Sequence, residues 1–213
     1  TRRSAVMYAR STSVQGDPAR IDEGIRYVRE EVMPAVTGME GCMGLSMLVD
    51  RGTGRVIVTT SWSSEDEMRA TDINVSALRS RAAEIMRSDE PEVREWEIAV
   101  MHREHDTREG SWCRVTWLTC PPEDLESTLD FFRDTVLPGL EEFDGFCSAS
   151  MLVDRATGQC CATARFDSRE DLDATRDMAR GMRDRRSADS GVVFGDIEEC
   201  ELVIAHLRVP ELV

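Results

Sequence analysis

The stretch MLVDRGTG at residues 47–54 returns as MLVDRATG at residues 151–158, with a single difference between the two copies. Each copy starts in an apolar segment and ends in Asp-Arg-x-Thr-Gly. Asp and Gly are typical of a tight hairpin turn, because Gly adopts a positive φ at little cost. Each copy therefore predicts two antiparallel strands joined by a short turn, with Gly54 and Gly158 at the position of positive φ.

The same spacing extends over most of the chain. The two copies begin 104 positions apart, and this one shift aligns the halves without a gap from Tyr8 to His102. The identical aligned pairs include Arg10 with Arg114, Pro34 with Pro138, Thr71 with Thr175, Arg79 with Arg183, and His102 with His206. We interpret the chain as two tandem repeats produced by gene duplication, one at residues 1–105 and the other at residues 106–213.

Each repeat has one helical pattern before its hairpin and another after it. Segments 17–36 and 121–140 carry apolar residues at steps of three and four, which is typical of amphipathic helices. Asp17 is the expected N-cap of the first helix, with Pro18 in its first turn. Ser64 and Ser168 are the expected N-caps of the helix that follows each hairpin.

The order of the expected elements in each repeat is β-α-β-β-α-β, the ferredoxin-like unit. Two helices cover one face of such a sheet, yet residues 44–49 are apolar on both faces of their strand. We therefore predict an α+β fold in which the antiparallel sheets of the two ferredoxin-like repeats face each other in an intramolecular, pseudo-dimeric barrel. Such a chain is expected to be a monomer with an internal pseudo-two-fold axis, and a weak dimer is the alternative.

The composition narrows the range of partners. The formal net charge is −15, and all 26 basic residues are Arg. An acidic protein of this kind is not expected to bind nucleic acid or an anionic membrane. We find no apolar run of membrane-spanning length and no signal-peptide pattern, so we expect a cytoplasmic protein. The seven Cys residues include no C-x-x-C pair, which predicts reduced core thiols and no metal site.

The segment TTSWSSEDEM at residues 59–68 ends a strand with Trp62 and opens a helix with Ser and acidic residues. Together with the element order and the size of each repeat, this segment resembles the antibiotic-biosynthesis-monooxygenase-like branch of the dimeric α+β barrel superfamily. The resemblance implies a pocket between the helices and the sheet of each unit. It also implies a cofactor-independent monooxygenase that acts on a small aromatic or polyketide-like substrate.

The same resemblance bears on haem. Haem-degrading members of the superfamily use an Asn, a Trp and a His, and the corresponding places in the first repeat fall near Ala9, on Thr71 and on Arg81. The second repeat lacks these three residues as well. We therefore expect neither haem nor any other cofactor.

Three residues of the first repeat are candidate catalytic groups. His102 is the leading candidate for a general base, since an unperturbed His titrates near neutral pH. Thr71 lies where family members place a polar residue that faces the pocket, and Arg10 would stabilise a developing oxyanion. Each has a structural alternative: a sheet-edge hydrogen bond for His102, a bond to a carbonyl of its own helix for Thr71, and an ion pair with Glu97 for Arg10.

Five further residues are candidate substrate-binding groups: Trp62, Met68, Thr175, Arg114 and His206. Trp and Met supply apolar bulk, although core packing is the default role of both. The first repeat is the better candidate for the functional pocket, because it keeps Trp62 where the second has Phe166. The expected ligand is a small aromatic molecule.

Two functions of different classes stay open. An enzyme would supply a base, an oxyanion site and a dry cavity. A small-molecule-binding or scaffold protein would keep the same fold without the chemistry. The sequence alone does not choose between them, because it shows no set of nucleophile, base and orienting group.

Overall fold

A computed structural model describes residues 6–213, which divide into two compact units. The first unit runs to Trp96 and includes Glu201–Val209, and the second comprises Glu97–Cys200 and Pro210–Val213. Residues 1–5 of the predicted first repeat lie outside the described residues. No helix within residues 6–213 combines the length and the apolar character that a membrane span requires.

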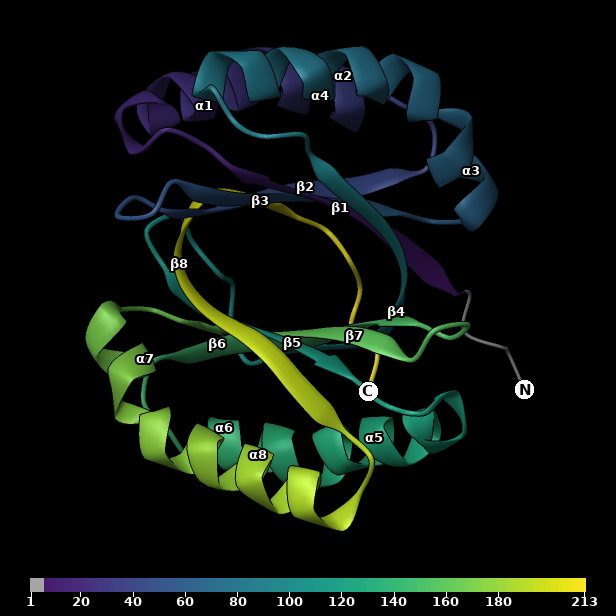
Figure 1. Ribbon diagram of the computed structural model, residues 1–213, viewed down its shortest axis with the longest axis vertical. Helices are drawn as coiled ribbons and strands as arrows, with labels where there is room; N and C mark the ends of the chain where they lie inside the picture. The colour runs from purple at the N-terminus through teal and green to yellow at the C-terminus, as the bar shows by residue number, and fades with distance from the viewer. Residues whose placement is uncertain (1–5) are drawn as a thin grey trace. The chain divides into compact units, whose positions relative to one another are not determined.

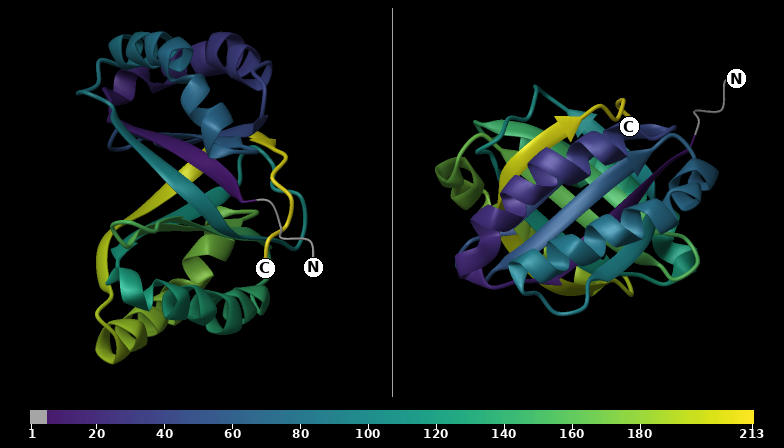
Figure 2. Two further views of the ribbon diagram at one scale, coloured as in Figure 1. Left: turned by 90° about the vertical axis from the view of Figure 1, so that its right-hand side faces the viewer. Right: turned by 90° about the horizontal axis from the view of Figure 1, so that it is seen from above.

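The first unit is an antiparallel sheet with helices on one of its faces (Figure 1). Its elements are β1 (Met7–Gln15), α1 (Ile21–Tyr27), α2 (Met33–Thr37), β2 (Cys42–Asp50), β3 (Arg55–Trp62), α3 (Glu65–Ala70), α4 (Asp72–Met86), the start of β4 (Glu92–Arg103) and the end of β8 (Val193–Leu207). β1 pairs with β3, β3 with β2, and β2 with the end of β8. The helices α1 and α2 lie along the same face of the sheet as α4 (Figure 2).

The second unit has the same order of elements. They are the end of β4, β5 (Trp112–Thr119), α5 (Leu125–Phe131), α6 (Leu137–Glu141), β6 (Phe146–Asp154), β7 (Gln159–Phe166), α7 (Arg169–Ala174), α8 (Arg176–Asp189) and the start of β8. β5 pairs with β7, β7 with β6, and β6 with the end of β4. The predicted β-α-β-β-α-β order is thus present twice along the chain, and its origin by duplication stays an inference from the sequence.

Two strands belong to both units. β4 begins beside β1, where Trp96 Nε1 donates to Ser11 Oγ at 2.8 Å, and it ends beside β6. β8 begins beside β5, where Trp117 Nε1 donates to Glu198 Oε2 at 2.8 Å, and it ends beside β2. The hydrogen-bonded order of the described strands is β1-β3-β2-β8-β5-β7-β6-β4, and it closes on itself. A closed antiparallel order agrees with the predicted fold class, whereas the facing of the two sheets stays a prediction.

The repeated phrase forms the predicted hairpin turn in each unit. Gly54 has a φ of 81° and Gly158 a φ of 73°, and the Gly54 N–H donates to the Asp50 carbonyl at 2.8 Å. A Cβ at either glycine would also overlap a neighbouring backbone oxygen, that of Gly16 in the first unit and that of Cys120 in the second. Gly is therefore required at these positions by both φ and close approach.

The long helix before each hairpin contains a wider, π-helical turn. This turn is Val28–Val32 between α1 and α2, and Phe132–Val136 between α5 and α6. Pro34 and Pro138 are the second residues after this turn. Proline lacks the N–H of a regular helical bond and its ring crowds the carbonyl four residues earlier, so the wider turn lets the helix continue. Asp17 caps the first of these helices as predicted, since its Oδ1 accepts from the Ala19 N–H at 2.9 Å.

Candidate binding site

Each unit contains a cavity between its helices and its sheet. The cavity of the first unit has a volume of about 50 Å³, and that of the second about 110 Å³. The larger volume is of the same order as an engineered cavity of about 150 Å³ that admits benzene. The sequence favoured the first repeat as the functional pocket, but the second unit has the larger cavity.

A methionine side chain explains much of this difference. Met86 lines the first cavity, is 2% exposed, and fills the space beside Gly24, where an added Cβ would overlap its side chain. The residue 104 positions after Met86 is Ser190, which is shorter. Ser190 is not among the residues that line the second cavity, so the described lining there has no counterpart of Met86.

The wall of the second cavity is mostly apolar, and its polar lining residues are arginines and threonines. Among the apolar lining residues are Leu118, Phe132, Val136, Leu140, Met151 and Met182. Arg114 reaches the cavity from β5, and Arg183 and Arg186 reach it from α8. An apolar cavity lined by several cations is suited to an organic anion.

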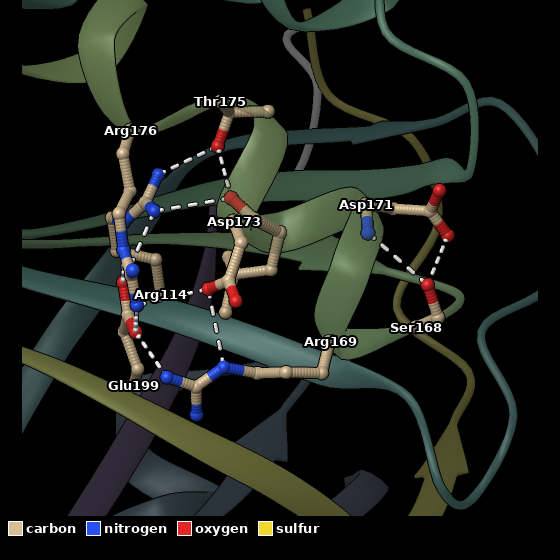
Figure 3. A network of polar contacts seen from close by, with 9 residues as sticks. Arg114, Ser168, Arg169, Asp171, Asp173, Thr175, Arg176 and Glu199 are labelled. Atoms are coloured by element: carbon tan, nitrogen blue, oxygen red, sulfur yellow. Dashed lines mark hydrogen bonds and ion pairs between the residues drawn. The ribbon is translucent and has the colours of Figure 1, made fainter.

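Arg114 is buried and held in one orientation (Figure 3). Its Nη1 donates to Thr175 Oγ1 at 2.7 Å, and its Nη2 donates to the Leu172 carbonyl at 3.2 Å and to Glu199 Oε1 at 3.1 Å. The Thr175 hydroxyl in turn donates to the Leu172 carbonyl at 2.7 Å. This network fixes one cation at the cavity wall.

Glu199 accepts hydrogen bonds from three guanidinium groups (Figure 3). Besides Arg114, it accepts from Arg169 Nη2 at 3.0 Å and from Arg176 Nη2 at 2.8 Å. Burial alone would raise the pKa of Glu199, but the hydrogen bonds from Arg176 and Arg114 outweigh burial and lower it below its ordinary value. Arg114 therefore shares this carboxylate with two other cations.

The two remaining cations of the second cavity, Arg183 and Arg186, form no ion pair with a carboxylate within residues 6–213. Arg186 Nη2 donates to the hydroxyls of Ser127 and Thr128, each at 2.9 Å, and its guanidinium lies 5.4 Å from the Phe131 ring centroid. The Nε of Arg186 is buried and forms no hydrogen bond with any atom of residues 6–213. Burial lowers the pKa of Arg183, and the nearby charge of Arg114 lowers it further, although the charge of Asp184 acts in the opposite direction. Both residues would gain from an added negative charge.

The first cavity is lined by Arg10 and Arg79, which correspond to Arg114 and Arg183 of the second cavity, but carboxylates lie close to both of them. Arg10 Nη2 lies 3.1 Å from Glu95 Oε1 and 3.7 Å from Asp72 Oδ1, and Arg79 Nη2 lies 3.7 Å from the same Asp72 oxygen. The residue 104 positions after Asp72 is Arg176, so the second unit has a cation where the first has an anion. The excess of positive charge is therefore specific to the second cavity.

Of the residues predicted from the sequence, Arg10 and Arg114 line the cavities of their own units. Thr71 and Thr175 are not lining residues, and each hydroxyl donates to a carbonyl three residues earlier in the chain, at 2.7 Å. Each also accepts from its arginine, at 3.5 Å from Arg10 and at 2.7 Å from Arg114. The two threonines thus position a guanidinium and do not contact the cavity.

The expected partner of Arg10 was wrong by two residues. Arg10 pairs with Glu95 and not with Glu97, whose Oε2 lies 2.6 Å from Arg155 Nε in the second unit. Residues two apart on a strand share a face, so the sequence indicated the correct face of β4 but not the correct register. Arg155 belongs to the repeated phrase, and its counterpart Arg51 pairs with Glu201 at 3.1 Å.

Trp62 and Met68 are fully buried and belong to the core of the first unit. The Trp62 indole Nε1 donates to Thr60 Oγ1 at 3.0 Å. Neither residue lines the cavity of that unit. The structure therefore gives both residues the packing role that the sequence allowed as the alternative.

His102 and His206 line neither cavity. His206 is half-buried on β8, beside Leu45 of β2. His102, near the end of β4, is 14% exposed and directs its ring nitrogens at carboxylates. The structure therefore does not bring His102 to a molecule in either cavity, which the role of general base would require.

Sequence reasoning missed Arg79, Arg183 and Arg186. A signal was available, because Arg183 and Arg186 follow Met178, Ala179 and Met182 at the steps of one helix face. Arginines within an otherwise apolar stripe of a helix indicate a polar requirement inside the core. The retention of Arg79 and Arg183 at matching positions was a second signal.

No protein-family model matches the chain. The uncharacterized protein Rv2558 of Mycobacterium tuberculosis (strain H37Rv) is 45% identical over 212 residues, which cover 99% of this chain and 89% of that protein. An anthrone oxidase-like protein of known structure aligns with a TM-score of 0.68 at 14% identity, over 96% of this chain and 93% of its own.

A ferredoxin-fold protein from Listeria monocytogenes 4b F2365, related to antibiotic biosynthesis monooxygenases, aligns with a TM-score of 0.57 at 10% identity, over 94% and 96% of the two chains. Sequence identities this low establish a shared fold and nothing more. The predicted resemblance to the antibiotic-biosynthesis-monooxygenase-like α+β proteins is confirmed at that level.

Proposed function

The chain belongs to the family of the Mycobacterium tuberculosis protein Rv2558, and we propose that it binds a small aromatic anion in the cavity of its second unit. The observation that carries this proposal is the pair Arg183 and Arg186, which line the cavity and form no ion pair with a carboxylate within residues 6–213. Unpaired charge is costly to bury, so a bound anion would remove a penalty that the free protein bears.

The shape of the site supports a ring with one acidic group. A guanidinium forms two parallel hydrogen bonds to a carboxylate, and the buried Nε of Arg186 offers one of the donors. The apolar wall would enclose the ring, and a volume of about 110 Å³ favours one ring over several. Burial of one ring together with a paired charge would give a dissociation constant on the order of micromolar.

Calorimetric titration with benzoate, salicylate and the uncharged benzyl alcohol tests this proposal. We expect both acids to bind and the alcohol to bind at least tenfold more weakly. Arg183→Gln should weaken benzoate binding at least tenfold, whereas the matched variant Arg79→Gln, at the corresponding position of the first cavity, should leave it unchanged. Equal binding of acid and alcohol, or an equal loss in both variants, would refute an anion site in the second cavity.

Oxygenation of the bound anion without a cofactor is a second candidate function. The buried guanidinium of Arg114 favours it, because a fixed cation at the cavity wall stabilises a phenolate or a developing oxyanion. The described lining of the second cavity offers no His, Asp, Glu, Tyr or Cys as a base. The substrate would therefore have to bind already deprotonated.

The two candidate functions differ in one measurement. Consumption of dissolved oxygen on a panel of phenols and anthrones, in the presence of a chelator, would support oxygenation. The test uses the same protein samples as the calorimetry. Binding of the acids without oxygen consumption would leave the binding function and remove the oxygenase.

The lining residues do not fit haem. A haem group is far larger than a cavity of about 50 or 110 Å³, and neither described cavity lining contains a His, Cys or Tyr to bind its iron. No step of the proposed function involves haem.

A further inference from the structure

Three carboxylates converge on one imidazole at a site away from both cavities. His102 Nε2 lies 2.9 Å from Glu141 Oε1 and 3.2 Å from Glu104 Oε1, and His102 Nδ1 lies 2.8 Å from Glu211 Oε1. The four residues come from β4, the segment after it, α6 and the C-terminal segment, and all belong to the second unit.

The two ring nitrogens of His102 have different surroundings. A neutral imidazole carries one N–H, and the short contact at Nδ1 is suited to donation to Glu211. The lone pair of Nε2 would then face Glu104 and Glu141, and either a proton or a metal ion at Nε2 would remove the repulsion between them. A carboxylate that accepts from one ring nitrogen while the other binds a metal is the usual environment of a metal-ligating histidine.

The separations of the donor atoms also suit a metal ion. Two ligands of a tetrahedral metal site, each about 2.1 Å from the metal, lie about 3.4 Å apart, and two ligands at right angles, as in an octahedral site, lie about 3.0 Å apart. The distances from Nε2 to the two glutamate oxygens, 2.9 and 3.2 Å, bracket the right-angle value. The donor atoms of His102, Glu104 and Glu141 all lie within 4.8 Å of one another.

The histidine ring is fixed before any ion arrives. It stacks on the buried Phe146 ring, with centroids 6.3 Å apart and an interplanar angle of 18°. Two backbone hydrogen bonds between Met101 and Leu212, at 2.8 and 2.7 Å, hold the segment that carries Glu211 beside β4. A ring with a fixed orientation costs less to bring into a metal site than a mobile one.

The matching positions of the first unit provide a natural control. His206 corresponds to His102, but Arg208 stands for Glu104 and Thr37 for Glu141. A cation and a hydroxyl replace the two carboxylate ligands there. The donor set is therefore specific to the second unit, although the histidine occurs in both.

We propose that the second unit binds one divalent transition-metal ion through His102 Nε2, Glu104 and Glu141, with Glu211 orienting the imidazole. One nitrogen and two carboxylate oxygens suit zinc or manganese, and three protein ligands leave positions for water or a small ligand. The ion would tie β4, α6 and, through Glu211, the C-terminal segment together. The proposal is independent of the anion site, which lies at other residues.

A second group of potential ligands needs a control of its own. His105, Cys147 and Asp167 also place ligand atoms within 4.8 Å of one another. Burial, aided by a hydrogen bond to Asp167, raises the pKa of the Cys147 thiol to about 12. The thiol must lose its proton to bind a metal, so this group is the weaker candidate.

The test is titration of chelator-treated, tag-free full chain with Zn²⁺ and with Mn²⁺, followed by calorimetry and thermal unfolding. We expect one ion per chain and a rise in the unfolding temperature. His102→Gln and Glu141→Gln should each weaken binding at least tenfold, while His206→Gln and Cys147→Ser should not change it. Circular dichroism would show that each variant is folded.

Two results would overturn the proposal. One is the absence of saturable binding at one ion per chain to the folded wild type. The other is binding that survives His102→Gln or Glu141→Gln, or that is lost in Cys147→Ser.

Discussion

The buried arginines of the two units depend on their carboxylate partners to different degrees. Arg114 relies on Glu199, whose side chain is 19% exposed, whereas Arg10 relies on Glu95, which is 36% exposed, and has Asp72 nearby. Loss of one partner from a buried pair is costly because the other charge stays behind without compensation. The same exchange of Glu for Gln should therefore have unequal effects at the two places.

We expect Glu199→Gln to lower the free energy of unfolding by about 3 kcal/mol at pH 7, and Glu95→Gln by about 1 kcal/mol or less. Urea denaturation measures both. The folded state lowers the pKa of Glu199, so its stabilisation is complete above the ordinary pKa of a glutamate and is lost as the pH falls through the lowered value. The free energies of unfolding of wild type and Glu199→Gln should thus become equal at acidic pH. Equal losses at pH 7 would contradict the unequal burial.

Glycine is required in the hairpin turn of the second unit but is not required inside its last helix. Gly158 closes the second hairpin at positive φ, against the backbone oxygen of Cys120. Gly181 lies inside α8, and an added Cβ there would meet no atom within 4 Å. One glycine is required by its surroundings, and the other only lowers the stability of its helix.

We predict opposite effects for two Gly→Ala substitutions. Gly158→Ala should lower the unfolding free energy by about 2 kcal/mol or more, from the left-handed conformation and the overlap with Cys120. Gly181→Ala should raise it by about 0.5–1 kcal/mol, because alanine restricts the unfolded chain. Thermal or urea unfolding of both variants provides the measurement. An unchanged free energy of unfolding in Gly158→Ala would show that the turn can adopt another conformation.

Each compact unit contains strand residues from both halves of the chain. The first unit includes Glu201–Val209, whose β8 residues pair with β2. The second unit includes the end of β4, which pairs with β6. A cut between the sequence repeats therefore removes a strand from a sheet and does not separate two complete domains.

We expect a chain that ends at Arg103 to dimerise or aggregate, because β2 would present an unpaired edge where β8 normally binds. Light scattering should report about 24 kDa for the full chain and a larger species for the truncated one. A variant in which a flexible linker joins Arg103 to residues 201–209 is the matched control, and it should recover a smaller size. A truncated chain that remains monomeric on dilution would show that β2 does not need this partner.

The local features of this fold were predictable from the sequence, and the long-range ones were not. Gly54 and the Asp17 cap follow from the chemistry of a few neighbouring residues, and the repeat marked Arg10 and Arg114. The choice of Glu95 over Glu97 depends on strand register, which distant pairings decide. The surroundings of His102 combine residues far apart in the chain, which no spacing rule in the sequence reveals. The size of the second cavity depends on how side chains fill space.

The division of β8 between the two units also has a consequence for the order in which the protein forms during synthesis. Val49 of β2 pairs with Glu201, so this edge of the first sheet must stay open until nearly all of the described chain has left the ribosome. The β6 edge of the second sheet does not wait in this way, because it pairs with the end of β4, which is made before it, whereas the β5 edge also waits for the start of β8. Contacts so distant in sequence form slowly, and an open strand edge invites association with other chains. The nascent protein is therefore most exposed to misassembly at β2.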